Sequence, residues 1–398
     1  MNAQASSTVA LAKQARRRML RQQGFSLVEI LVGIVIGMVG LLVIFKTVAI
    51  WDNHTRSTVS GGDAQVAGTL AMFNLERDIK QAGMGFGRAA SGVMGCTVTG
   101  VDTSGGGRNL SFPLRPIDLT VDATGGPDTL TVLAGNSSFF VDNARIVGAT
   151  PTAKQFKDTT GLRKGDVAVL APASGTACEL IQITDNSDPD RVSVSHSGLG
   201  SYVPDVAYQP ANPAAAVPPR YNVSTGTTGT YVPGGTLFNL GSAPQLNVWS
   251  VTGGRVLSRV NQMQGTAAVE VSDGVINMKA QYGVDADGNN EIANSEWVTT
   301  APTDWSRVRA VRVALLVRSS QFEKPVAAAS TSIAMPPTPT SKNPTWAGGT
   351  FVMTNVDATG SADTRSDTDV VPENWRFYRY RVYEKVIPLR NMIWGNTP

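Results

Sequence analysis

The sequence predicts an α+β protein in which a long N-terminal membrane-spanning helix packs on a large antiparallel β-rich head. An apolar run near the N-terminus is long enough to cross a bilayer. From about residue 84 onward, short β-type runs alternate with Gly, Pro, Asn and Asp. The low proportion of charged residues (16%) with 40 Gly and 22 Pro also favours strands joined by turns over further helices.

The positive charge of the chain is concentrated at its N-terminus. Residues 1–24 contain no acidic residue and five basic ones, namely Lys13, Arg16, Arg17, Arg18 and Arg21. The remainder carries 29 basic and 31 acidic residues, a net charge of −2, so we expect no nucleic-acid partner. Basic residues before an apolar segment place that end in the cytoplasm and the C-terminal part in the periplasm.

The apolar segment runs from Phe25 to Trp51, and its central stretch, 30–45, has no charged residue. As a helix these 27 residues would be about 40 Å long, enough to cross a hydrocarbon core of about 30 Å. Its glycines share one helix face, which would allow close packing of neighbouring helices: Gly33, Gly37 and Gly40. Glycine is also common in membrane helices generally, so this spacing leaves both interpretations open.

The junction before the apolar run carries a specific pattern. Gly24 is followed by Phe25, and Glu29 is the fifth residue after the glycine. This arrangement resembles the cleavage and methylation signal of type IV prepilins and pseudopilins. The resemblance implies that a prepilin peptidase removes residues 1–24, between Gly24 and Phe25, and methylates the new amine of Phe25. No small-residue cleavage site of the ordinary secretory kind follows the apolar run.

The same resemblance gives Glu29 a role. In this family the glutamate pairs with the N-terminal amine of a neighbouring subunit during assembly, and a buried charge is tolerable when it is paired. The alternative is a single-pass anchor that carries a glutamate near the membrane interface by chance. Met1 and Met19 both fit as the translation start, and Met19 would leave a short leader of the usual prepilin kind.

One helix is predicted over residues 25–82, with about 25–51 in the membrane or the filament core. Beyond Trp51 the chain becomes polar, but apolar residues still recur at a rough spacing of three to four positions, as in an amphipathic helix: Val66, Leu70, Phe73, Leu75, Ile79 and Ala82. Gly83 stands where a helix-terminating glycine belongs. We therefore expect the second half of the helix to pack on the head, residues 83–398.

The head is predicted to contain strands at 127–133, 165–171, 178–184, 245–251, 309–319 and 375–389. In the run 309–319 apolar and polar residues alternate, which predicts an antiparallel strand packed on one side, with Arg312 and Arg318 on the other. Two stretches lack such patterns and are predicted as loops, 203–235 and 326–349. They could serve as subunit contacts or be disordered insertions, and the sequence leaves both open.

Cys96 and Cys178 are the only cysteines, and the predicted topology puts both in an oxidising compartment. A bridge between them would close a loop of about 80 residues and stabilise the fold by about 4 kcal/mol. The alternative is two buried free thiols.

The sequence contains no catalytic motif, and two histidines leave little material for a triad or a His-based metal site. We therefore expect neither an enzyme nor a cofactor, and a solvated His54. One acidic loop is a weak calcium candidate, because four residues have the spacing of positions 1, 3, 5 and 12 of an EF-hand: Asp285, Asp287, Asn289 and Glu296. Position 6 is Asn290 rather than glycine and no helices flank the loop, so a hairpin turn is the simpler interpretation.

Four further stretches resemble PilW-type minor pilins of type IV pili: 68–87, 275–290, 305–319 and 375–394. The resemblance implies a pilin-like fold and a low-abundance subunit that primes filament assembly at or near the tip. Its partners would be the prepilin peptidase, other minor pilins, the major pilin and, at the tip, a large adhesin. It would stay in the inner membrane until it joins a surface pilus that serves twitching motility or cell adhesion. The alternatives are a J-like pseudopilin of type II secretion and a stand-alone membrane-anchored adhesin.

Overall fold

The computed structural model describes residues 26–87, 89, 93–137, 144–173, 177–229, 231, 234–322, 340, 342–356 and 374–395. The chain divides into two compact units, residues 1–59 and residues 60–398. The first unit is helical throughout its described part from Leu27 onward. The second contains the end of the same helix and all of the described strands.

The long helix α2 (Leu27–Gln81) begins directly after Ser26, whose carbonyl accepts the first two helical bonds, from the backbone N–H of Glu29 and Ile30. It ends at Gln81, and Gly83 follows two residues later with a φ of +81°, which suits the terminating glycine that the sequence predicts. The side-chain Nδ2 of Asn391 donates to the carbonyls of Gln81 and Ala82 at 3.1 and 3.0 Å. These bonds satisfy carbonyl groups that have no partner within the helix.

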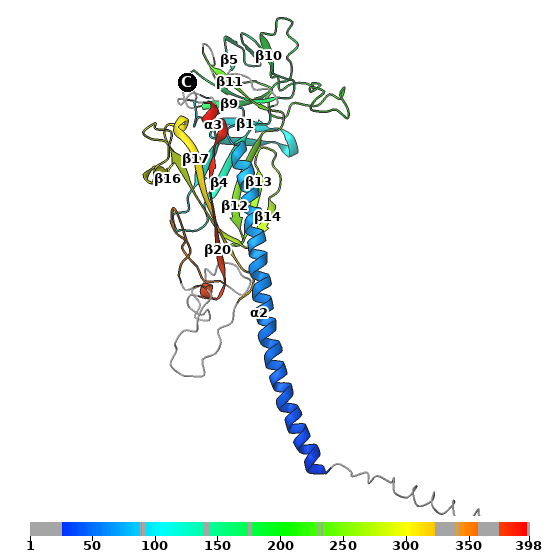
Figure 1. The fold of residues 1–398 in the computed structure, drawn as a ribbon. Coiled ribbons are helices and arrows are strands. Elements are labelled where there is room, and N and C mark those ends of the chain that lie inside the picture. Colours follow the sequence, from blue (N-terminus) through cyan, green and yellow to red (C-terminus); the bar gives the residue numbers. More distant parts are fainter. Residues whose placement is uncertain are drawn as a thin grey trace, which may run out of the picture. The chain divides into compact units, whose positions relative to one another are not determined.

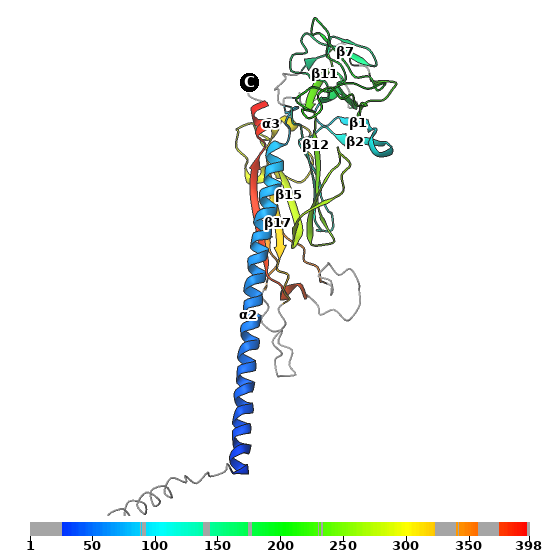
Figure 2. The same cartoon turned by 90° about the vertical axis from the view of Figure 1, so that its right-hand side faces the viewer.

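The strands of the head form several sheets, which the two views in Figures 1 and 2 show from sides 90° apart. The largest has the order β2 (Arg108–Pro113), β1 (Thr97–Asp102), β9 (Ala177–Gln182), β8 (Val167–Ala171), β11 (Thr236–Gly241), β5 (Ala144–Arg145). Its pairs are antiparallel except for β1 with β9, which run parallel. A small sheet has the order β10 (Ser193–Ser195), β7 (Ala153–Gln155), β6 (Gly148–Ala149).

Two antiparallel sheets lie beside the last turns of α2. One has the order β14 (Val269–Asp273), β13 (Val256–Asn261), β12 (Gln245–Thr252), β4 (Thr129–Ala134), β3 (Ile117–Thr120). The other has the order β16 (Trp297–Val298), β15 (Val275–Val284), β17 (Val308–Arg318), β20 (Tyr380–Pro388). The remaining elements are β18 (Thr345–Trp346), β19 (Gly349–Thr350), α3 (Arg390–Gly395) and the 3-10 turns η2 (Ser104–Gly106), η3 (Asn294–Glu296), η4 (Trp305–Arg307) and η5 (Asn374–Phe377).

The main core lies between these two sheets and the helix. Ala71, Leu75 and Ile79 of α2 are fully buried in one cluster with Trp249 of β12 and Val313 of β17. The predicted apolar stripe is confirmed for Leu75, Ile79 and Ala82 but is wrong for Val66, Leu70 and Phe73, which are 69%, 50% and 59% exposed. A second, smaller core lies on the largest sheet, where Leu170 and Ile181 are buried. Both cores are closed by side chains from strands far apart in the sequence.

Five of the six predicted strands are present with ends within a few residues of their expected bounds. The sixth, 375–389, was expected to be extended throughout, but Asn374–Phe377 form η5 and the strand begins only at Tyr380. Trp375 and Phe377 are buried in this turn, so packing of the aromatic rings overrides their preference for a strand.

The prediction that the strand 309–319 packs on one side only is wrong. In β17 the second face is also buried, with Ala314 and Leu316 packed against Phe351. Arg312 was expected at the surface. Its Cζ lies 4.6 Å from the centroid of the Trp297 ring and 5.5 Å from that of the Trp346 ring. The physical reason is that the segment 342–356, distant in the sequence, covers this face of the sheet.

The predicted loops differ in outcome. The described residues of 203–235 lie outside the named strands, with one isolated bridge between Tyr202 and Val217. Most of the loop 326–349 falls outside the described residues. Its described end does not stay irregular, because β18 and β19 pair there as a small hairpin.

Candidate functional site

The first unit presents the predicted assembly segment. Glu29 lies in the first turn of α2 and is exposed, and no partner of its side chain occurs among the described residues. The processing residues Gly24 and Phe25 fall outside the described part of the chain. His54 lies in the helix, and its side chain also falls outside what the structure describes.

The helix around Glu29 is apolar and uncovered. Leu27–Asp52 has a mean hydropathy of 2.9 and none of its apolar window is buried, and it is the one described helix long and apolar enough to cross a membrane. Its large side chains are more than half exposed, including Leu31, Ile36 and Phe45. Apolar surface of this extent requires lipid or other apolar helices around it.

The glycines of this segment leave one side of the helix open. A Cβ built on Gly33, Gly37 or Gly40 would meet nothing within 4 Å. The described chain therefore gives these glycines no packing partner of its own. Their role as a helix-packing face stays a prediction.

Two comparisons with known families bear on these features. Residues 19–45 match the model of the prokaryotic N-terminal methylation motif. Residues 220–391, from the segment before β11 into α3, match the model of the type IV pilus-assembly protein W. The chain is a PilW-type pilin. No curated protein and no solved structure matches it significantly.

The two matches also define the coarse role of this PilW-type pilin. The methylation motif implies processing by a prepilin peptidase and partners in pilus assembly. Together with the apolar helix it fits a protein anchored in the inner membrane. Both families are structural subunits rather than enzymes. Strands β1 to β10 lie outside the PilW match.

In the second unit of the pilin, a buried carboxylate fixes the helix to the sheet. Asp78 is 5% exposed and accepts hydrogen bonds from Asn247 Nδ2 at 2.8 Å and from Trp249 Nε1 at 3.0 Å. Arg259 Nη1 lies 3.7 Å from the same oxygen. In the sequence, Asp78 lies within the stretch 68–87 that resembles PilW-type pilins, but nothing in that stretch shows its partners on β12 and β13.

A second contact joins the helix to β20. Gly68 faces the ring of Tyr383, and a Cβ on this glycine would lie 2.1 Å from Tyr383 Cε2. The hydroxyl of Tyr383 donates to the carbonyl of Gln65 at 3.0 Å. Close approach of the ring to the backbone therefore requires glycine at this position.

Cys96 and Cys178 form a disulfide, with their Cα atoms 5.9 Å apart. The bridge lies beside the parallel pair β1 and β9, whose register includes Val98 with Cys178. It therefore ties the start of the largest sheet to a strand about 80 residues later in the chain.

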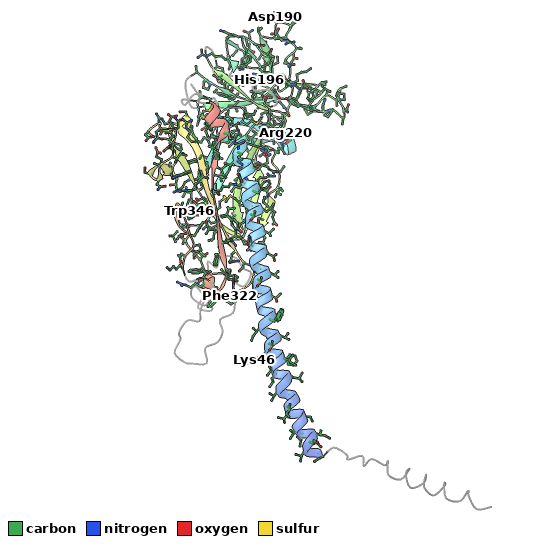
Figure 3. All side chains as sticks on the ribbon, in the orientation of Figure 1. Lys46, Asp190, His196, Arg220, Phe322 and Trp346 are labelled. Atoms are coloured by element: carbon green, nitrogen blue, oxygen red, sulfur yellow. A yellow bond between two sulfur atoms is a disulfide. The ribbon has the colours of Figure 1, made fainter. Side chains whose placement is uncertain are left out.

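His196 lies in a buried polar group in the upper part of the head (Figure 3). Lys154 Nζ donates to His196 Nε2 and to Thr227 Oγ1, both at 3.0 Å. Burial, with the nearby Lys154 charge, lowers the pKa of His196 to about 3, and burial lowers the pKa of Lys154 to about 8. The histidine is thus a neutral acceptor within the fold.

The acidic loop lies between β15 and β16. These strands pair antiparallel, Tyr282 with Val298 and Gly283 with Trp297, so the loop does connect a hairpin. The structure also brings the predicted calcium candidates together. One carboxylate oxygen from each of Asp285, Asp287 and Glu296 lies within 4.8 Å of the other two, and the Asn289 side chain donates a hydrogen bond to Asp287.

Proposed function

We propose that this PilW-type minor pilin primes type IV pilus assembly and is incorporated at or near the filament tip. The prepilin peptidase would cleave between Gly24 and Phe25 and methylate the new amine. The observation that carries the proposal is the helix Leu27–Asp52, whose apolar surface is wholly uncovered and bears Glu29 in its first turn, within the matched methylation motif.

Glu29 supports docking in one register. A carboxylate in lipid costs about 2.5–3.5 kcal/mol at mid-bilayer on insertion scales, so a partner of opposite charge is favoured. The methylated amine of a neighbouring subunit would be such a partner, and a pair is tolerated where a lone charge is not. The open face at Gly33, Gly37 and Gly40 leaves room for a second helix to approach.

The head supports a terminal rather than a repeating position. Its own cores are closed by helix and sheets, and most of the exposed large apolar side chains lie in the long N-terminal helix. Strands β1 to β10 lie outside the PilW match and enlarge the head. A subunit at the tip has one face without a following subunit, which accommodates such added bulk.

A complementation experiment tests the role of Glu29. In cells lacking the gene, Glu29→Gln should reach normal membrane levels, but sheared pili should fall about tenfold or more and contain none of the variant. Glu270→Gln, an exposed glutamate of β14, is the matched control and should restore pili fully. Normal piliation with Glu29→Gln would refute the pairing. A secretion defect with intact pili would refute the pilus role and favour a pseudopilin.

The N-terminal mass of the protein from cells tests the processing step. A mature chain that begins at methylated Phe25, present only with the prepilin peptidase, is the expected result. An intact N-terminus in wild-type cells would leave a plain membrane-anchored protein and would overturn the assembly mechanism.

A further inference from the structure

Strand β16 is the edge strand of the four-stranded sheet (Figure 1). The loop that joins β15 to β16 brings three carboxylates together. One carboxylate oxygen from each of Asp285, Asp287 and Glu296 lies within 4.8 Å of the other two. Asn289 lies beside them, with its Nδ2 donating to Asp287 Oδ2 at 2.9 Å. Oxygen atoms at these separations could share one cation, because Ca²⁺ binds oxygen at about 2.3–2.6 Å.

One oxygen of this group has no partner of its own. Asp285 is fully buried, and its Oδ2 accepts from the backbone N–H of Asn290 at 3.2 Å. Its Oδ1 is also buried but accepts no hydrogen bond within the described chain. A buried carboxylate oxygen without a partner is costly. A cation held between Asp285, Asp287 and Glu296 would supply the missing interaction.

The cations around the loop do not cancel its charge. Arg309 Nε lies 3.4 Å from Asp285 Oδ2, which leaves Oδ1 unpaired. Arg307 donates from Nη1 to the backbone carbonyls of Asp285 and Ala286, and also pairs with Asp304. With Glu291 the loop carries four carboxylates, so its net charge stays negative after both arginines are counted.

The backbone of the loop also suits the spacing of its ligands. Asn290 stands at position 6, where an EF-hand has glycine, and adopts a φ of +65°. Asparagine tolerates this conformation better than most residues. Glu296 is held over the loop because its two oxygens accept the backbone N–H groups of Ala286 and Ala293, each at 2.8 Å. Each oxygen keeps a lone pair for a metal.

We propose that this loop binds Ca²⁺, with Asp285, Asp287 and Glu296 as carboxylate ligands. Calcium fits better than magnesium because it accepts several oxygen ligands in flexible geometry, whereas Mg²⁺ demands a near-ideal octahedron. The bound ion would fix the β15–β16 hairpin and η3. The proposal concerns the head alone and does not depend on the pilus role.

The test uses the full chain purified in detergent after chelation. Trp297 follows Glu296 directly, so Tb³⁺ in the site should emit when tryptophan is excited. Competition against Tb³⁺ should give a Kd for Ca²⁺ of about 10⁻⁴–10⁻³ M, and Mg²⁺ should compete less well. Ca²⁺ should also raise the melting temperature more than Mg²⁺ does.

Asp287→Asn is the first variant because Asp287 is exposed, so the fold should survive its loss. It should weaken the Tb³⁺ signal and the Ca²⁺ affinity about tenfold or more. Glu296→Gln should do the same. Asp190→Asn, an exposed aspartate of another loop, is the matched control and should change neither. Equal Tb³⁺ emission from wild type and Asp287→Asn, or no Ca²⁺-specific shift in wild type, would overturn the proposal.

Discussion

Asp78, in the last turn of α2, accepts a hydrogen bond from the indole Nε1 of Trp249 on β12 at 3.0 Å. Both side chains are buried, and Asn247 donates to the same carboxylate oxygen. The C-terminal end of α2 is thus joined to β12 by a polar contact inside an apolar core.

Replacing this carboxylate should destabilise the head strongly. Asp78→Ala leaves the buried Trp249 indole without its acceptor and leaves Asn247 Nδ2 with Gln245 Oε1 alone, so the free energy of unfolding should fall by about 2–4 kcal/mol. Urea unfolding followed by tryptophan fluorescence measures the change. Asp190→Ala, at an exposed position, should shift it by less than about 0.5 kcal/mol. Equal effects of the two variants would contradict the role given to Asp78.

The close contact between Gly68 and Tyr383 predicts opposite effects of two similar substitutions. Gly68→Ala places a methyl group against the Tyr383 ring and should cost about 1–3 kcal/mol. Gly62→Ala, also in α2, meets nothing within 4 Å and should stabilise by up to about 1 kcal/mol through helix propensity.

A double variant shows whether the ring is the cause. Adding Tyr383→Ala to Gly68→Ala should remove most of the clash, so the two changes should be non-additive in thermal unfolding. Additive effects would mean that the ring moves aside freely and that glycine is not required there.

Because of the disulfide, we expect the free energy of unfolding to depend strongly on whether the cysteines are oxidised. The double variant Cys96→Ala/Cys178→Ala should lose about 4 kcal/mol of unfolding free energy, because the unfolded chain regains the freedom of a loop of about 80 residues. Reduction by dithiothreitol should destabilise wild type by a similar amount and leave the variant unchanged. A variant that still responds to reduction would contradict this account.

Because His196 is buried and neutral, we expect the free energy of unfolding to decrease as the pH is lowered through the acid range. Its folded-state pKa of about 3 lies below the ordinary value of 6.5, so the unfolded chain binds the proton first. Stability should therefore drop between about pH 6.5 and pH 3, by up to about 1.4 kcal/mol per pH unit for this group. In His196→Gln, the free energy of unfolding should therefore change less with pH in that window than it does in the wild type.

Asp102 also makes stability depend on pH, but in a more acidic range than His196 does. Hydrogen bonds from Arg220, Ser104 and Arg108 lower the pKa of its carboxyl, so its contribution is present above the ordinary aspartate range and is lost as pH falls below it. That loss should remain in His196→Gln. A variant curve identical to wild type from pH 6.5 to 4 would show that His196 does not titrate as argued.

Much of the fold was predictable because local patterns specify it. The extent of the long helix follows from its apolar residues, and its end just before Gly83 follows from the ease with which glycine adopts a positive φ. The strands β4, β8, β9, β12 and β17 follow from short apolar runs between turn residues. These signals are local, so they are present in the sequence whatever the chain packs against.

The partners of the functional side chains were not predictable in the same way. Asp78 finds Trp249, and Gly68 finds Tyr383, across separations of 171 and 315 residues. Arg312 lies against Trp346 because residues 342–356 cover the outer face of β17. No local pattern encodes which distant segment covers a face, since burial depends on the whole packed arrangement.

The sequence by itself determined the processing signal, the apolar helix and the β-rich class, because each depends on residues close together in the chain. Only the tertiary structure decided that Asp78 is buried, that β17 is covered on both faces and that the Asp285 oxygen lacks a partner. Those facts depend on which remote side chains exclude water and which donors reach a given acceptor, and folding alone brings these groups together.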